Sequence, residues 1–180
     1  MLHLTRRESI ATMLAFGASM TFGVSAAQAG PQYLDKTGYA VSGYDVVAYR
    51  SLRQSKLGAQ QPKAVPGRKE FTTEWNGAKW AFSSAENRDA FIKNPAAYAP
   101  LYDGHCAYGV AVGGKVPGNP HLWRIVDGKL YLNITPEVVE IWEKDIPGYI
   151  AKAEKLWRGL EAKAASRAQV PYFDTRKAPV

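Results

Sequence analysis

The residues of this chain that could perform chemistry are few, and two of them are adjacent. Cys106 is the only cysteine, and His105 directly precedes it within residues 101–110. Beyond the first thirty residues His121 is the only other histidine, and no methionine remains. Thiolate and imidazole groups bind copper and zinc, and they also serve as the nucleophile and base of thiol enzymes. The candidate site is therefore composed of Cys106, His105 and His121.

The first hypothesis for these residues is a metal site, with copper favoured over zinc. Adjacent residues rarely bind one ion through both side chains, so His121, which follows a Gly/Pro turn, is an easier second ligand to Cys106 than His105. A closed zinc site has four protein ligands, and three candidates fall short of that number. The auxiliary ligands that would complete the site, besides water, are Asp103, Tyr102 and Tyr108.

The second hypothesis is a non-enzymatic module that binds a small ligand or a protein partner. Free cysteine is among the residues most often buried, so Cys106 would then be part of the core. The aromatic residues that could line a groove in such a module are Tyr44, Tyr49, Trp75, Trp80, Tyr102 and Trp123.

A third hypothesis makes Cys106 a catalytic nucleophile with a histidine as its base. An orienting carboxylate would have to come from Asp103, Asp45 or Asp127. No known hydrolase motif surrounds the cysteine, so an enzyme is the less favoured interpretation.

The local structure around Cys106 bears on its reactivity. Asp103 is a candidate N-cap for a helix that runs through Val112 and ends at Gly113-Gly114. Cys106 would lie in its first turn, where backbone N–H groups and the helix dipole lower the pKa of a thiol. A strand is the alternative, because residues 107–110 also alternate.

Two hairpins, each followed by a helix, are the clearest elements of the chain. Residues 70–75 and 78–82 alternate like strands around Asn76-Gly77, a strong two-residue turn signal. Residues 122–126 and 129–133 form the second pair around Asp127-Gly128. The helices after them are expected to begin at a capping box, Ser83 with Glu86, and at Thr135-Pro136.

A last helix is expected at about residues 149–165, with an apolar face at helical spacing. Residues 51–69 lack periodicity and predict an exposed loop, and residues 166–180 predict a loose C-terminal tail. The pattern predicts an α+β fold, with β-hairpins packed on helices in a single domain over residues 30–165.

Residues 1–29 are typical of a secretory signal peptide. Arg6-Arg7 precedes an apolar run, and Ala27-Gln28-Ala29 provides the small residues that a signal peptidase recognises. The arginine pair is similar to a twin-arginine signal, although Ser9 stands where that pattern favours Phe, and an ordinary Sec signal is the alternative. The signal peptide would engage the export machinery, and the mature protein would be periplasmic or secreted, without a transmembrane span.

The net charge of +7 becomes (23 − 2) − (16 − 1) = +6 once two Arg and one Glu of the leader are removed. Positive charge on an exported protein indicates acidic partners or an anionic membrane surface, and the compartment argues against nucleic acid. The basic residues are dispersed, so most are expected to form an ordinary solvated surface.

Four stretches of the chain resemble the YHS-domain family, in its secreted bacterial branch. They are Gly43-Tyr44-Asp45-Val46-Val47-Ala48-Tyr49, residues 75–91, Gly104-His105-Cys106-Ala107-Tyr108-Gly109-Val110 and residues 125–133. The resemblance covers roughly residues 38–158. It implies a small YHS/TRASH-like unit, a hairpin packed on a helix and related to treble-clef modules, and a role in handling metals, above all copper.

The chain departs from that family at its metal-binding cysteines. The positions that match them are Val47, Ser83 or Ser84, and Asn87, and none of these residues carries sulfur. The metal site that the resemblance implies therefore cannot be transferred to those positions, and Cys106 is the sulfur that the chain offers instead.

Overall fold

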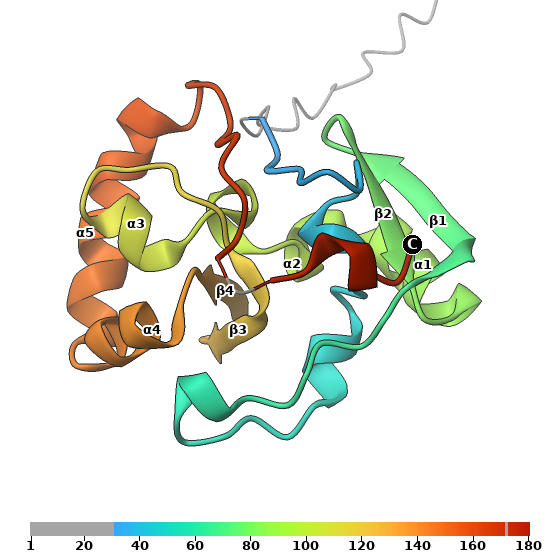
Figure 1. Cartoon of the computed structure of the whole chain (residues 1–180), viewed down its shortest axis with the longest axis horizontal. Helices are drawn as coiled ribbons and strands as arrows, with labels where there is room; N and C mark the ends of the chain where they lie inside the picture. The colour runs from blue at the N-terminus through green and yellow to red at the C-terminus, as the bar shows by residue number, and fades with distance from the viewer. Residues whose placement is uncertain (1–30, 172) are drawn as a thin grey trace, which may run out of the picture.

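The computed structural model describes residues 31–171 and 173–180, so the expected signal peptide lies outside the described residues. The described chain is mixed α+β, as the sequence predicts, with two small antiparallel hairpins and a long C-terminal helix. Figure 1 shows the first hairpin and its helix on one side, helices α3, α4 and α5 on the other, and the second hairpin between them.

The first hairpin joins β1 (Arg68–Trp75) to β2 (Ala78–Phe82). Asn76 and Gly77 have φ values of 50° and 68°, the left-handed conformation that a tight two-residue hairpin turn requires. Helix α1 (Ala85–Lys93) follows, and its N-cap is Ser84, which accepts a hydrogen bond from the backbone N–H of Asn87. The predicted cap, Ser83, is thus wrong by one residue, because the Ser83 hydroxyl donates to Asp45 instead.

The second hairpin joins β3 (Asn119–Val126) to β4 (Lys129–Asn133) through Asp127 and Gly128, which also have positive φ. Helix α4 (Pro136–Glu143) follows with Thr135 as its N-cap, which confirms the predicted start. The Thr135 hydroxyl accepts from the N–H of Val138 at 3.3 Å. Both predicted hairpins are therefore confirmed. They could be predicted because two adjacent residues encode each turn.

The remaining helices are α2 (Pro95–Tyr98), α3 (Ala107–Ala111) and α5 (Ile146–Leu160). Helix α5 starts earlier than predicted because the Asp145 side chain accepts from the N–H of Gly148 and caps it, and it ends earlier as well. Short 3₁₀ turns occur at Val41–Gly43, Ala48–Ser51, Gly58–Gln60, Leu101–Gly104 and Thr175–Lys177.

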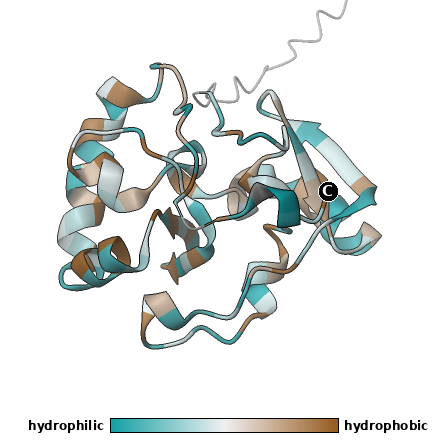
Figure 2. Cartoon of the chain, viewed as in Figure 1, coloured by the Kyte–Doolittle hydropathy of each residue, from teal (hydrophilic) through white to brown (hydrophobic). Residues whose placement is uncertain are grey.

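Two apolar clusters form the core, and the second hairpin contributes to both. One cluster gathers around the first hairpin and contains Trp80 and Phe91, and the other lies among α3, α4 and α5 and contains Trp142. In β4, Leu130 and Leu132 belong to the first cluster, whereas Tyr131 belongs to the second. Successive strand side chains point to opposite faces, so β4 joins the two halves into one body. Figure 2 shows hydrophobic segments on α4, on α5 and in the second hairpin.

The C-terminal tail, predicted to be loose, instead packs on the domain. The side chain of Val170 is buried, and the Ala168 carbonyl accepts a hydrogen bond of 2.9 Å from the Tyr33 hydroxyl. Figure 1 shows this segment crossing in front of the domain, from the end of α5 toward the first hairpin. The contact with Tyr33 spans 135 residues of sequence, so local composition did not indicate it.

The loop over residues 51–69 is also less exposed than predicted. Gly58, Gln61 and Ala64 are buried within it, and its last residues begin β1. The guanidinium of Arg124 donates to the carbonyl oxygens of Ser55 and Lys56, which ties the loop to β3.

In the described part of the chain, none of the helices combines the length and the apolar character needed to cross a bilayer.

Candidate functional site

Cys106 is completely buried at the start of α3, where it is itself the N-cap residue. Its sulfur accepts a hydrogen bond from the N–H of Gly109 at 3.3 Å, and its thiol donates to the Asn133 side-chain oxygen at 3.4 Å. The predicted cap, Asp103, lies in the preceding 3₁₀ turn with φ of 52°. The predicted helix start is therefore wrong, because that turn reverses the chain before the helix begins at Ala107.

Burial raises the pKa of the Cys106 thiol to about 11, although the backbone N–H groups near the sulfur, that of Gly109 first among them, act in the opposite direction. The expectation of a lowered thiol pKa at a helix start is therefore wrong here. Desolvation exceeds the effect of the N–H groups, so the sulfur is a neutral thiol at physiological pH.

His105 is also completely buried, and both of its ring nitrogens have partners. Nδ1 lies 2.8 Å from the carbonyl oxygen of Tyr102, and Nε2 accepts from the backbone N–H of Ser166 at 3.1 Å. This pairing fixes the neutral tautomer with the proton on Nδ1. Burial lowers the pKa of His105 to about 4. The ring is therefore an anchor for the C-terminal tail.

His121 lies on β3 in different surroundings. Its Nδ1 accepts from the N–H of Ala64 at 3.2 Å, and its ring packs edge-on against Tyr44 with 4.8 Å between centroids. Phe173, from the C-terminal tail, contacts the same ring at 5.7 Å. Burial and the positive charge of Lys63 lower the pKa of His121 to about 4.

The three predicted ligands thus have three separate sets of partners. No group of three His, Cys, Asp or Glu side chains suited to a metal ion occurs in residues 31–171 and 173–180. Of the auxiliary candidates, Tyr102 and Asp103 are buried in the turn before His105, and Tyr108 packs on Tyr149 with 5.2 Å between ring centroids.

A polar cluster that sequence reasoning did not single out as a unit lies at the first hairpin. Asp45 is completely buried, and its carboxylate accepts from the backbone N–H groups of Val47, Ala48 and Ser83. It also accepts from the Ser83 hydroxyl at 2.6 Å and from the Asn87 amide at 2.7 Å. Val47, Ser83 or Ser84, and Asn87 are the positions that the sequence comparison above matched to cysteine ligands of the YHS family, and Val47, Ser83 and Asn87 all bond to Asp45. In this chain those positions surround a carboxylate instead.

Asp45 and Cys106 have matching local roles. Each is the third residue of a Gly-aromatic triplet, Gly43-Tyr44-Asp45 or Gly104-His105-Cys106, and each accepts the N–H of the residue three positions on. Each also bonds to the end of the hairpin that follows it, at Ser83 or at Asn133. Cys106 therefore joins a turn to a hairpin, as Asp45 does in the first half of the domain.

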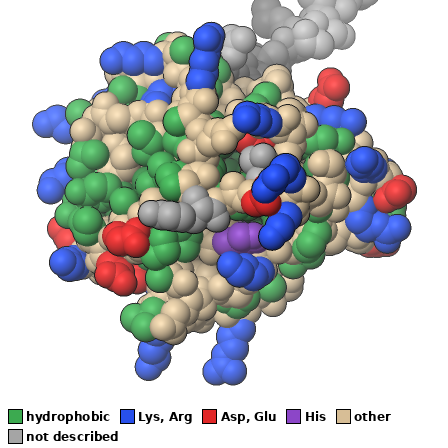
Figure 3. Space-filling view, viewed as in Figure 1, with side chains coloured by type: hydrophobic (Ala, Val, Ile, Leu, Met, Phe, Trp, Pro, Cys, Tyr) green, Lys and Arg blue, Asp and Glu red, His purple; other side chains and the backbone are tan. Residues whose placement is uncertain are grey.

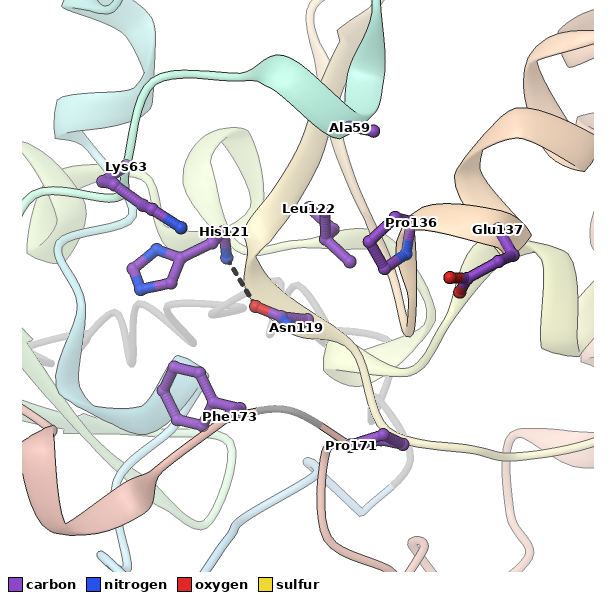
Figure 4. Close-up of a pocket in the computed structure, with 9 residues that line it drawn as sticks. All are labelled: Ala59, Lys63, Asn119, His121, Leu122, Pro136, Glu137, Pro171 and Phe173. Atoms are coloured by element: carbon purple, nitrogen blue, oxygen red, sulfur yellow. Dashed lines mark hydrogen bonds between the residues drawn. The ribbon is translucent and has the colours of Figure 1, made fainter.

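A pocket of about 310 Å³ opens beside His121, between the long loop, β3, the start of α4 and the tail. Figure 4 shows Lys63 and His121 at one end, Glu137 at the other, and Asn119 between them. The remaining lining residues are Ala59, Leu122, Pro136, Pro171 and Phe173. Only His121 was a sequence candidate, because the other walls come together through the packing of the loop and the tail.

A second hollow of about 210 Å³ adjoins this pocket and shares His121 and Phe173 with it. Tyr44, Asp174 and Lys177 complete its lining. Asp174 pairs with Arg176 at 2.8 Å, so its charge is largely compensated. Figure 3 shows the visible histidine side chain among several Lys and Arg side chains on this face.

Comparisons of the chain with family models, with curated proteins and with solved structures found no match.

Proposed function

We propose that this protein is an exported, non-enzymatic YHS-type module that binds a small molecule in the pocket beside His121. In this proposal Cys106 is a structural residue of the core. The hairpin-plus-helix units and the YHS-like stretches support the assignment to this type. The apolar run after Arg6-Arg7 supports export.

The observation that carries the proposal is the pocket itself. Its volume of about 310 Å³ lies at the lower end of the range of small-molecule sites, which are mostly apolar with a few converging polar groups. Leu122, Pro136 and Phe173 supply apolar walls, and Lys63 and His121 supply polar atoms at one end.

The environments of Cys106 and His105 favour this function over copper handling and thiol catalysis. A metal or a substrate at Cys106 would have to break its hydrogen bonds to Asn133 and Gly109, and His105 holds the tail through Ser166. Copper binding through Cys106, with His105 or His121, stays a prediction, and titration of the native protein and of Cys106→Ala with Cu(I) tests it.

The proposal is tested by NMR on the ¹⁵N-labelled mature protein, titrated with benzyl alcohol, phenylacetate and benzylamine. At least one of these probes is expected to shift the resonances of His121, Leu122 and Phe173. Ala59→Phe should abolish the shifts by filling the pocket, whereas Ala151→Phe, on the exposed face of α5, should leave them unchanged.

Two results would contradict the proposal. The first is saturable binding of none of the three probes in the pocket. The second is a stoichiometric Cu(I) complex of the native protein that is lost in Cys106→Ala, which would restore the copper hypothesis.

A further inference from the structure

The hydrogen bond between Ala64 and His121 determines which ring nitrogen of His121 is left as a donor. Its Nδ1 accepts a hydrogen bond from the backbone N–H of Ala64, so the neutral ring carries its proton on Nε2. The lowered pKa of His121 is consistent with a neutral ring. The other ring nitrogen, Nε2, is therefore left as a hydrogen-bond donor at the pocket wall.

Two further donors line the same pocket, Lys63 beside His121 and Asn119 next along the wall. Lys63 lines the pocket, and its ammonium group has no acidic partner in the described part of the chain. The side-chain oxygen of Asn119 already accepts from the N–H of His121, so the amide group has its N–H donors left to offer. Asn119 is buried and therefore held in place, and no carboxylate of the described residues lines the pocket beside these donors, because Glu137 lies at the far end.

The rest of the pocket has a different character. Leu122, Pro136, Pro171 and Phe173 form apolar walls, and Glu137 at the far end carries the only carboxylate of the lining. Burial of an apolar body against such walls contributes roughly 25 cal/mol per Å². A second negative charge at the far end would meet Glu137 and be repelled.

We propose that the ligand is a small organic oxyanion, a carboxylate or a phosphate, with an apolar body and a single anionic end. Lys63, the Nε2–H of His121 and the amide of Asn119 hold the oxyanion, and the apolar body contacts Phe173 and the prolines. Glu137 selects against a second anion. This inference rests on the proposed ligand-binding function of the same pocket.

Calorimetry on the mature protein compares phenylacetate, phenyl phosphate, benzyl alcohol and benzylamine. The two anions are expected to bind more tightly than the alcohol and the amine, and the tighter of the two identifies the oxyanion. Lys63→Gln should weaken anion binding about threefold to fivefold, as loss of one exposed charge contact does, and added salt should weaken it in the same direction. Lys155→Gln, which makes the same charge change on α5, should have no effect.

Glu137 is tested with 1,4-phenylenediacetate, which carries two carboxylates. It should bind more weakly than phenylacetate to the wild type, and the difference should shrink in Glu137→Gln. Equal binding of both anions to the wild type would overturn the role of Glu137.

Failure of this inference differs from failure of the proposed function. If benzyl alcohol or benzylamine binds in the pocket as tightly as phenylacetate, or Lys63→Gln leaves anion binding unchanged, the oxyanion inference is wrong while the ligand pocket stands. If none of the probes binds there, both are wrong.

Discussion

Cys106 and His105 owe their properties to burial and to fixed hydrogen bonds. The Cys106 thiol is out of contact with water and therefore keeps its proton. It accepts a hydrogen bond from the N–H of Gly109 and donates one to the Asn133 side chain, so it links these residues within the core. His105 loses its proton readily for the same reason, since burial disfavours the charged form of either group. Adjacency in sequence therefore does not make these two residues a reactive pair.

We expect Cys106 to be inert in the native protein at neutral pH, because its thiol is buried and its pKa is about 11. Iodoacetamide should not modify it within hours, and one adduct should form rapidly in urea. Mass spectrometry measures both. Rapid alkylation of the folded protein would contradict the burial and revive the thiol-chemistry hypothesis.

His105 makes the stability depend on pH in a defined window. Its folded pKa of about 4 lies below the ordinary value of 6.5, so the folded state binds fewer protons than the unfolded chain between these values. The contribution of His105 is therefore full above pH of about 6.5, falls as the pH decreases, and is lost below about 4. The loss is at most about 3 kcal/mol.

Urea unfolding across this pH range measures the effect. His105→Asn should be less stable near neutral pH, and its free energy of unfolding should fall less steeply with acid than that of the wild type. His121→Asn is the comparison, because it removes the other histidine with a lowered pKa, which contacts the tail through the Phe173 ring and accepts no hydrogen bond from it. Parallel curves for the wild type and His105→Asn would contradict the assignment.

At the scale of elements, Asp45 joins the Ala48–Ser51 turn, the end of β2 and α1. A buried carboxylate is costly unless hydrogen bonds satisfy it, and here five donors do so. Asp45 therefore holds these three elements together through hydrogen bonds.

Asp45→Ala is expected to destabilise the protein by about 3 kcal/mol or more, because it leaves several buried donors unsatisfied. Urea unfolding of the mature protein measures the loss. Asp89→Ala, which removes an exposed carboxylate from α1, should change stability by less than about 1 kcal/mol. Similar small losses for both variants would show that the Asp45 cluster contributes little.

The two hairpins and the start of α4 could be predicted because Asn76-Gly77, Asp127-Gly128 and Thr135-Pro136 encode them locally. The environment of Cys106 could not be predicted from the sequence. It depends on Asn133, twenty-seven residues away, and on a turn in which Tyr102 and Asp103 adopt positive φ without glycine. The sequence left burial of Cys106 in the core as one alternative, which the structure confirms, but it gave no sign of the residues that bond to the thiol.

At the scale of the whole molecule, the C-terminal tail belongs to the domain. It caps His105 through Ser166, bonds to Tyr33 and supplies Pro171 and Phe173 to the pocket. Sequence composition could not show this, because each contact joins the tail to a residue more than fifty positions earlier. The same long-range packing explains why the pocket was not predicted.

Val170→Ala should therefore destabilise the protein by about 1–2 kcal/mol, as loss of buried methyl groups does, and should weaken probe binding in the pocket. Gln169→Ala, at the exposed neighbouring position, should change neither property. Urea unfolding and the ¹⁵N titration measure the two effects. If Val170→Ala had as little effect as Gln169→Ala, packing of the tail would contribute neither to stability nor to probe binding.

The packing of the tail also has a consequence for synthesis. Ser166, Pro171 and Phe173 are translated after every strand and α-helix of the described chain. Both hairpins of a nascent chain are thus synthesised before the backbone N–H that His105 accepts and before one wall of the pocket. A ligand of the proposed pocket could therefore be held only after Pro171 and Phe173 have been made and have packed on the domain.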